Sequence, residues 1–360
     1  MRYGARRSSI RLGLFLALIL TVSVFPGNVS AQTFSITAAP GGITFTNFIW
    51  LFGSFGTMNA LAIGAPSAGV TAIPLSNGAL YYTPYQLTAA GLAAGHKAGV
   101  TAYVSTNFAH PAALIPESCA YPQACTSAGQ YGVMSTNAGA PTTVIGAPGI
   151  GNTTVTAGLA LFLPDNNGAS AYTGTDNARI TFTLTDLSNG TTVGTVTMWL
   201  NLPAETVQNA VQLTLSTAPS GATIVPAADY SLNFGTVNAL GIGPGAGLAT
   251  QAVAGGMVYH TPYLLNPAFA AFTSTTATIK VYVSTNFAHP TILALDDASA
   301  SGGPYSAIST NAGAATQITN TAADRSSITR YIGLFVANTN GPTAFNGTDT
   351  ATLTFTLTVP

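Results

Sequence analysis

Long stretches of the chain alternate apolar residues with threonine. At residues 180–185 and 352–359, threonine occupies every second position and apolar residues lie between them. This is the period of a β-strand that has one buried and one solvated face. Clusters of Gly, Pro and Asn, such as those at residues 65–69 and 243–247, separate the strands as turns. The pattern predicts an all-β protein built as an antiparallel sandwich.

The same sequence words occur twice along the chain. Residues 55–61, Phe-Gly-Thr-Met-Asn-Ala-Leu, correspond to residues 234–240 at a shift of 179, and residues 103–111 are identical to residues 282–290 at the same shift. Solenoid repeats have periods of roughly 20–50 residues. A period this much longer predicts two complete domains, each with its own core.

The repeat sets the expected domain boundaries. We predict a first β-sandwich at residues 32–186 and a second at residues 211–360. The segment between them, residues 187–210, has no counterpart in the second copy. It is expected to be a linker with an extra strand, because residues 192–201 read as a strand.

The first 31 residues have the pattern of a signal peptide. Four arginines precede an apolar run at residues 12–25, and the small-residue end Val29-Ser30-Ala31 follows it. The run is shorter than the roughly 20 residues that a spanning helix needs. We expect cleavage after Ala31, export by the general secretory route, and a secreted or cell-surface protein with no membrane span after cleavage.

Charged residues are rare in this chain. Asp, Glu, Lys and Arg make up 5% of it, against about 25% in a typical soluble domain. Without residues 1–31, five basic and ten acidic residues remain, which gives a formal net charge of −5. No cluster of Lys or Arg remains that could hold phosphate groups. Nucleic acid and anionic membrane surfaces are therefore excluded as partners.

Cys119 and Cys125 are the only cysteines. In an exported protein, an isolated pair so close in sequence predicts a local disulfide. A metal or redox site would need further Cys residues or flanking His residues, and no set of metal ligands recurs in the two copies. We expect no metal and no cofactor.

Each copy has a histidine and an aspartate at corresponding places, His110 with Asp176 and His289 with Asp349. With the serine five residues before each histidine, they could compose a hydrolytic triad. The serines lack the Gly-x-Ser-x-Gly turn that activates a nucleophile, and the His-Pro and Gly-Thr-Asp words are typical of turns. We favour a structural role and expect no enzymatic activity. A secreted hydrolase is the least favoured alternative.

Tyrosines beside a Thr-Pro pair also recur, as Tyr81, Tyr82 and Tyr85 in the first copy and Tyr259 and Tyr263 in the second. Exposed, these rings could stack on a sugar, which would make the protein a carbohydrate-binding module with a polysaccharide as its partner. The favoured interpretation places the rings in the sandwich, half buried, with their hydroxyl groups at its rim.

The scarcity of charge affects the sheet edges. Edge strands usually carry charges and prolines that prevent pairing with other chains, and this chain has few charges to place there. Its edges are expected to be free to pair with neighbouring copies or with other surface proteins. This favours a structural or adhesive cell-surface protein that assembles by β-strand addition.

Two sequence words carry a resemblance to a known group. Residues 234–236, Phe-Gly-Thr, follow the first strand of the second copy, and residues 349–360 form an alternating terminal strand. Each copy thereby resembles bacterial surface β-sandwiches of the fimbrial and spore coat protein U-like kind. The resemblance implies secreted, immunoglobulin-like, non-enzymatic domains that assemble by strand donation. Because the N-terminal strand recurs inside the chain, residues 192–201 are the better candidate for an added strand.

Overall fold

The computed structural model describes residues 32–46, 49–51, 57–64, 66, 68–165, 176–202, 206–207, 210–226, 229–339 and 345–360. The predicted signal peptide lies outside the described residues. The rest is almost entirely β-strand, so the predicted all-β sandwich class is confirmed. In the described part of the chain, the helical elements are two 3-10 turns, η2 (Ala128–Gln130) and η3 (Ala312–Ala314), and no helix is long and apolar enough to cross a bilayer.

One sheet of the first sandwich has the strand order β1-β6-β11-β8-β9, with β5 paired to β6. Its strands are β1 (Thr33–Ala38), β5 (Thr71–Leu75), β6 (Gly78–Ala90), β8 (Ile115–Cys119), β9 (Gly132–Val133) and β11 (Thr153–Pro164). From its middle to its end, β6 alternates buried with half-buried side chains, because successive side chains of a strand point to opposite faces.

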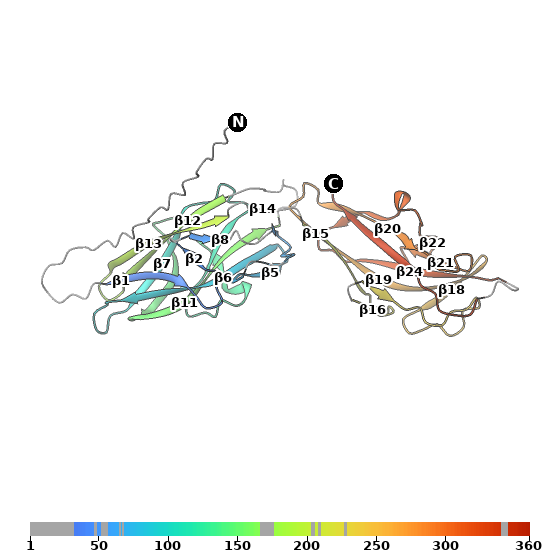
Figure 1. Cartoon of the computed structure of the whole chain (residues 1–360), viewed down its shortest axis with the longest axis horizontal. Helices are drawn as coiled ribbons and strands as arrows, with labels where there is room; N and C mark the ends of the chain where they lie inside the picture. The colour runs from blue at the N-terminus through green and yellow to red at the C-terminus, as the bar shows by residue number, and fades with distance from the viewer. Residues whose placement is uncertain are drawn as a thin grey trace, which may run out of the picture. The chain divides into compact units, whose positions relative to one another are not determined.

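The second sheet of this sandwich has the order β10-β7-β12-β13-β3-β2. Its strands are β2 (Phe45–Thr46), β3 (Ile49–Leu51), β7 (Ala98–Thr106), β10 (Thr142–Ile150), β12 (Asp176–Asp186) and β13 (Thr191–Leu202). A short parallel pair joins β4 (Thr57–Met58) to β14 (Thr206–Val207). These strands run from blue to yellow-green in Figure 1.

Strand β13 contains residues 192–201, the segment that the sequence suggests as the candidate for an added strand. It pairs antiparallel with β12 from Thr191 to Leu202 and, near its end, in parallel with β3. Residues 192–201 are therefore already paired within the sheet of the first copy. The alternation of the segment identified it as a strand but could not name its partner.

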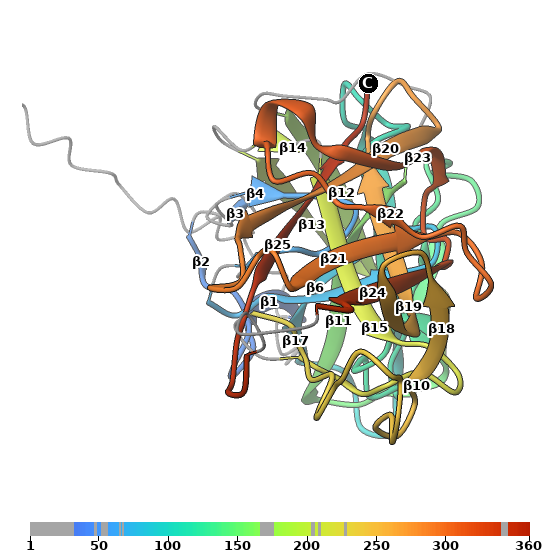
Figure 2. The ribbon, with the colours of Figure 1, turned by 90° about the vertical axis from the view of Figure 1, so that its right-hand side faces the viewer.

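The larger sheet of the second sandwich repeats the strand order of its counterpart in the first, and the other sheet repeats the first three strands of its counterpart. One sheet is β15-β19-β24-β21-β22, with β18 paired to β19, and the other is β23-β20-β25 (Figure 2). The first sheet contains β15 (Ala210–Thr217), β18 (Ala249–Val253), β19 (Gly256–Ala270), β21 (Leu293–Ala298), β22 (Ser306–Ala307) and β24 (Ile328–Ala337). The second contains β20 (Thr276–Thr285), β23 (Thr316–Ala323) and β25 (Thr352–Thr358), and a small hairpin joins β16 (Ile224–Val225) to β17 (Ser231–Leu232).

The two sheets of each sandwich meet through corresponding aromatic rings. Tyr85 of β6 meets Phe182 of β12 with ring centroids 5.8 Å apart, and Tyr263 of β19 meets Phe355 of β25 at 6.1 Å. The edge-to-face geometry of both pairs is one that aromatic rings prefer. The repeated sequence thus produces the same contact twice, between the two facing sheets.

The two copies differ in how deeply this contact is buried. Phe182 and the apolar residues two positions to either side of it are 0% exposed, whereas Phe355 and its corresponding neighbours are only partly buried. In the first copy β13 continues the sheet beside β12, and its Met198 and Leu200 are also 0% exposed. In the described part of the second copy, no strand continues the sheet beside β25.

The difference in burial between Phe182 and Phe355 predicts that replacing each ring with alanine lowers the free energy of unfolding by a different amount. Phe182→Ala should lower the free energy of unfolding by about 3–5 kcal/mol, as for a fully buried phenylalanine. Phe355→Ala should cost less than about half as much, because its ring is already partly solvated. Urea unfolding, with hydrogen exchange in β7 and β20 to separate the two sandwiches, measures both. Equal losses would contradict the difference in burial.

Candidate functional site

Asp176 ties the loop after β7 to the start of β12. Its carboxylate accepts hydrogen bonds from the backbone N–H groups of Ala109, His110 and Asn177 at 2.9, 3.0 and 2.8 Å, and lies 3.0 Å from His110 Nδ1. The carboxylate is 4% exposed and the imidazole 50%. Burial alone would raise the pKa of Asp176, but the hydrogen bonds outweigh it and hold that pKa below its usual value.

Asp349 does the same in the second copy. It accepts from the backbone N–H groups of Ala288, His289 and Thr350 at 2.9, 3.0 and 2.9 Å, and lies 2.9 Å from His289 Nδ1. Led by the bond from Ala288, these contacts lower the pKa of Asp349 to about 2. The His289 ring stacks on Phe345 at 3.8 Å. The carboxylate is therefore an acceptor for backbone donors at a loop, as its place in a turn predicts.

The structure brings each histidine and aspartate together but directs the candidate serines elsewhere. Ser105 Oγ donates to the carbonyl of Arg179 at 3.3 Å and accepts from Thr181 Oγ1 at 2.9 Å. Ser284 Oγ donates to the carbonyl of Thr352 at 3.2 Å. These bonds connect each serine with the neighbouring strand of its sheet. The arrangement suits a loop anchor, because the aspartate is occupied by three backbone donors.

A third histidine–aspartate pair, which the sequence comparison missed, lies only in the first copy. Asp186, at the end of β12, is 2.6 Å from His96 Nδ1 and accepts from the backbone N–H of Ser188 at 2.9 Å. The hydrogen bond from His96 is the main cause that lowers the pKa of Asp186. This pair fixes the turn that leads into β13. Val359 stands at the corresponding position of the second copy.

The repeated tyrosines lie mostly in the core. Tyr81, Tyr85, Tyr259 and Tyr263 are 2%, 1%, 0% and 3% exposed. Rings so deeply buried offer no face to a sugar. Tyr82, on the opposite face of β6, is half buried and packs against Tyr131 with ring centroids 5.3 Å apart.

Two of these tyrosines hold a repeated loop. Asn59 N–H donates to Tyr81 Oη at 3.1 Å, and Tyr81 Oη donates to the Asn59 carbonyl at 3.0 Å. Asn238 and Tyr259 make the same pair of bonds at 2.9 and 3.0 Å. The asparagine side chains also accept backbone N–H groups of their own loops. The repeated Asn-Ala-Leu word and the repeated tyrosine therefore serve one loop anchor, a link that their recurrence could have suggested.

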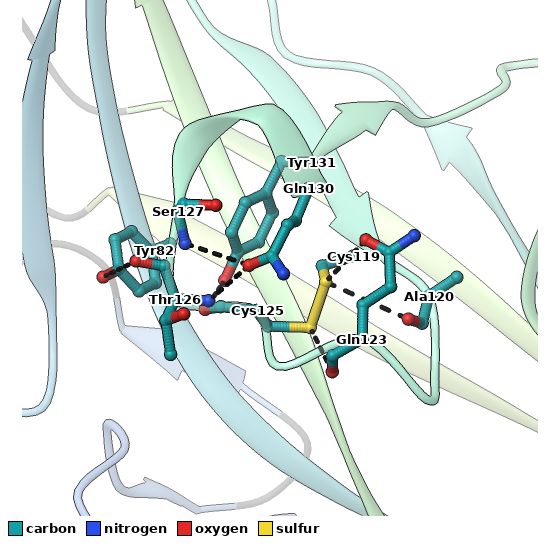
Figure 3. The surroundings of a disulfide bond; sticks show 9 residues. All are labelled: Tyr82, Cys119, Ala120, Gln123, Cys125, Thr126, Ser127, Gln130 and Tyr131. Atoms are coloured by element: carbon teal, nitrogen blue, oxygen red, sulfur yellow. Dashed lines mark hydrogen bonds between the residues drawn. A yellow bond between two sulfur atoms is a disulfide. The ribbon is translucent and has the colours of Figure 1, made fainter.

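The predicted disulfide is confirmed. Cys119 and Cys125 are bonded, with their Cα atoms 5.7 Å apart, and the loop that follows them places Tyr131 beside Tyr82 of β6 (Figure 3). Tyr131 Oη donates to the Cys125 carbonyl at 3.0 Å. A Cβ atom at Gly158 of β11 would lie 2.5 Å from Tyr131 Oη, so the loop packs this closely only on a glycine. The disulfide shapes this loop on the outer face of the sheet.

A shallow groove of about 420 Å³ runs beside this loop. Tyr121, which is 38% exposed, and Gln123 lie on the disulfide side, and Thr154 and Thr156 of β11 lie opposite. The groove brings an exposed ring together with several hydroxyl and amide groups near the predicted tyrosine site.

In the second copy, the sheet that corresponds to the one beneath the disulfide loop carries two buried acidic residues on β21. Asp296 of β21 lies opposite Gly333 of β24, and His260 of β19 lies opposite the same glycine from the other side. The Tyr305 ring covers this glycine and packs against His260 at 5.1 Å. Burial raises the pKa of Asp296 to about 6 and lowers the pKa of His260.

The next residue, Asp297, points into the sandwich. It forms an ion pair with Arg330 and accepts a hydrogen bond from Tyr263 Oη at 3.5 Å. Burial raises the pKa of Asp297 despite the opposing effect of Arg330. Glu117 lies at the first-copy position corresponding to Asp296, and burial raises its pKa too. Sequence comparison missed this correspondence because the residues around Glu117 and Asp296 differ.

Among the described residues, no group of three or more His, Cys, Asp or Glu side chains is placed to hold a metal ion.

Comparison with known proteins gives only distant similarities. No known family matches the chain, and no curated protein matches it. The CupB6 tip adhesin from Pseudomonas aeruginosa aligns at a TM-score of 0.28 and 11% identity, over 91% of this chain and 96% of that one. The enterotoxigenic E. coli adhesin CfaE aligns at 0.18 and 13%, over 94% and 84%. The N-terminal domain of PorA aligns at 0.22 and 12%, over 47% and 96%. The solved structures with which this chain aligns thus include bacterial adhesins.

The loop anchor predicts a contrast between its two side chains. Asp176→Ala should lower the free energy of unfolding by about 2–4 kcal/mol, because it leaves three backbone donors without their acceptor. His110→Ala should cost less than about 1 kcal/mol, because half of its ring is in water. Chemical denaturation of both variants measures the difference. A larger loss for His110→Ala would contradict an anchor based on the carboxylate.

The carboxyl group of Asp296 predicts a pH-dependent change in stability. Its pKa in the folded chain, about 6, lies above the usual value of 3.8, so folding favours the protonated form and ionisation at higher pH destabilises the fold. Asp296→Asn should therefore raise the melting temperature at pH 8 by roughly 2–4 °C and leave it nearly unchanged at pH 4. Asp229→Asn, at an exposed carboxylate, is the control. A gain only at pH 4 would contradict the sign.

Proposed function

We propose that the chain is an exported structural or adhesive surface protein, without enzymatic activity, that associates with copies of itself or with other surface proteins by β-strand addition. The observation that carries the proposal is the open edge of β25. Strand β20 pairs with β25 along one side, and in the described part of the chain no strand pairs along the other.

In the first copy, a strand occupies the corresponding edge. There, β13 pairs with the corresponding side of β12 from Asp176 to Asp186. Strand β25 carries no charge and no proline, the features with which edge strands usually prevent pairing. The backbone N–H and C=O groups on this side of β25, with which no described strand pairs, are therefore a suitable template for an added strand.

An added strand would also cover apolar surface. Leu353, Phe355 and Leu357 of β25 are partly buried, as are Leu213 and Leu215 of β15 on the facing sheet. Covering apolar area contributes roughly 25 cal/mol per Å². Pairing and burial would thus favour the same event.

The proposal that the chain is not an enzyme is supported by the site geometry. Asp176 and Asp349 are each occupied by three backbone donors, and the hydroxyl groups of Ser105 and Ser284 bond to neighbouring strands. Each of these polar groups thereby has a structural role.

The test of the proposed function is the state of association of residues 32–360. Analytical ultracentrifugation over a hundredfold range of concentration should show oligomers, and negative-stain microscopy should show their form. Binding to the surface of the producing cells, measured with labelled protein, tests the adhesive part. A chain that stays monomeric at every concentration and binds no cell surface would contradict the proposal.

Carbohydrate binding is the second candidate, and the groove beside the disulfide loop favours it. Tyr121 could stack on a sugar ring while Gln123 and Thr156 supply hydrogen bonds. Retention on polysaccharide columns that Tyr121→Ala abolishes and Tyr82→Ala preserves would place binding in this groove. No retention on any polysaccharide would remove this candidate.

A further inference from the structure

The open edge strand has a symmetric sequence. From Thr352 to Thr358, β25 reads Thr-Leu-Thr-Phe-Thr-Leu-Thr, which is the same in both directions about Phe355. The corresponding residues of β12, 179–185, read Arg-Ile-Thr-Phe-Thr-Leu-Thr and are not symmetric. Strand β12 pairs with β13 on this side, whereas within the described part of the chain β25 pairs only with β20. The symmetric copy of the sequence is therefore the one at the open edge.

Such a sequence is complementary to itself in an antiparallel pair. Around a two-fold axis, if residue i lies opposite residue j, then j lies opposite i. With the axis at Phe355, this residue faces its own equivalent, Leu353 faces Leu357, and Thr354 faces Thr356. Every apolar residue then meets an apolar residue and every threonine meets a threonine, and such cross-strand pairs stabilise a sheet.

The faces of the sheet also match. A two-fold axis perpendicular to the sheet leaves each face on its own side, so the apolar residues of both β25 strands stay on the core side. They would lie in one continuous row beside the half-buried Leu213 and Leu215 of β15 in each copy. The pair joins two three-stranded sheets into one of six strands, the number in the corresponding sheet of the first sandwich.

We propose that β25 pairs in register with β25 of a second copy of this chain, antiparallel about a two-fold axis at Phe355. This inference rests on the proposed function and names the partner and the register of its strand addition. The interface contains no charged residue within the strand. The nearest is Lys280 of β20, which lies opposite Thr356 and is exposed on the outer face.

Charge substitution on the outer face tests the pairing with little risk to the fold. Thr354 is half buried and Thr356 is exposed. Thr354→Glu/Thr356→Glu puts carboxylates directly opposite each other in the two-fold pair, and like charges opposite each other destabilise a sheet. Sedimentation should show dimerisation weakened about tenfold or more. Within each copy, Thr356→Glu lies opposite Lys280, so the monomer keeps its stability, which thermal unfolding checks.

Two matched variants make the result specific. Thr181→Glu/Thr183→Glu introduces the same charges at the corresponding positions of β12, beside β13, and should leave dimerisation unchanged. The Thr354→Lys variant, mixed with the double glutamate variant, should restore a mixed dimer by placing a lysine opposite a glutamate. Failure of this mixture to associate more strongly than the glutamate variant alone would overturn the proposed register.

Cross-linking tests the register independently. A mixture of Thr354→Cys and Thr356→Cys chains should form disulfide-linked dimers under mild oxidation several-fold faster than either variant alone, because only the mixture places the two thiols opposite each other. If the unmodified chain associates but neither charge nor cysteine variants affect it, β25 pairing is wrong while strand addition at another edge stands. If the unmodified chain never associates and binds no cell surface, the proposed function fails as well.

Discussion

The apolar face of a sheet must be covered, and the extent of this cover distinguishes the two halves of the chain. In the first sandwich, two six-stranded sheets face each other, and the strand β13 brings Met198 and Leu200 over the core. In the second, a six-stranded sheet faces three strands. Because the sequences of β12 and β25 are so similar, the lower burial of Phe355 agrees with the lack, among the described residues, of a strand beside β25 that corresponds to β13. The proposed strand addition rests on this one difference between the sheets that contain β12 and β25.

Buried hydrogen bonds explain why particular words recur in both copies. A backbone N–H that loses water on folding needs another acceptor, and with so few charged residues the chain uses a small set of acceptors repeatedly. Asp176 serves one loop, Asn59 and Tyr81 serve another, and Thr83 Oγ1 accepts from Ile43 N–H at 2.8 Å and donates to the Gly69 carbonyl at 2.7 Å. The repeated sequence words that suggest a catalytic site therefore hold loops against the sheets through hydrogen bonds.

The sequence predicted the features that depend on local pattern. The alternation of threonine with apolar residues identified the strands and the all-β class, and the close spacing of Cys119 and Cys125 identified the disulfide. Features that depend on long-range pairing were out of reach. Nothing in the alternation of residues 192–201 reveals that they pair with β12. The recurrence of His110 with Asp176 in both copies suggested that the two residues act together, but it could not reveal the backbone N–H groups that the carboxylate accepts. The correspondence of Glu117 with Asp296 emerges only from strand register.

The outer faces of the sheets bear short hydroxyl side chains that bond across strands, such as Thr88 with Thr154 at 2.8 Å and Thr181 with Thr197 at 3.3 Å. Interactions between exposed charges weaken as dissolved ions screen them, whereas neutral hydroxyl groups and apolar contacts are little affected. A surface of this kind should behave alike in dilute and in saline surroundings. Outside a cell, where the salinity of the medium is not regulated, that constancy would be an advantage.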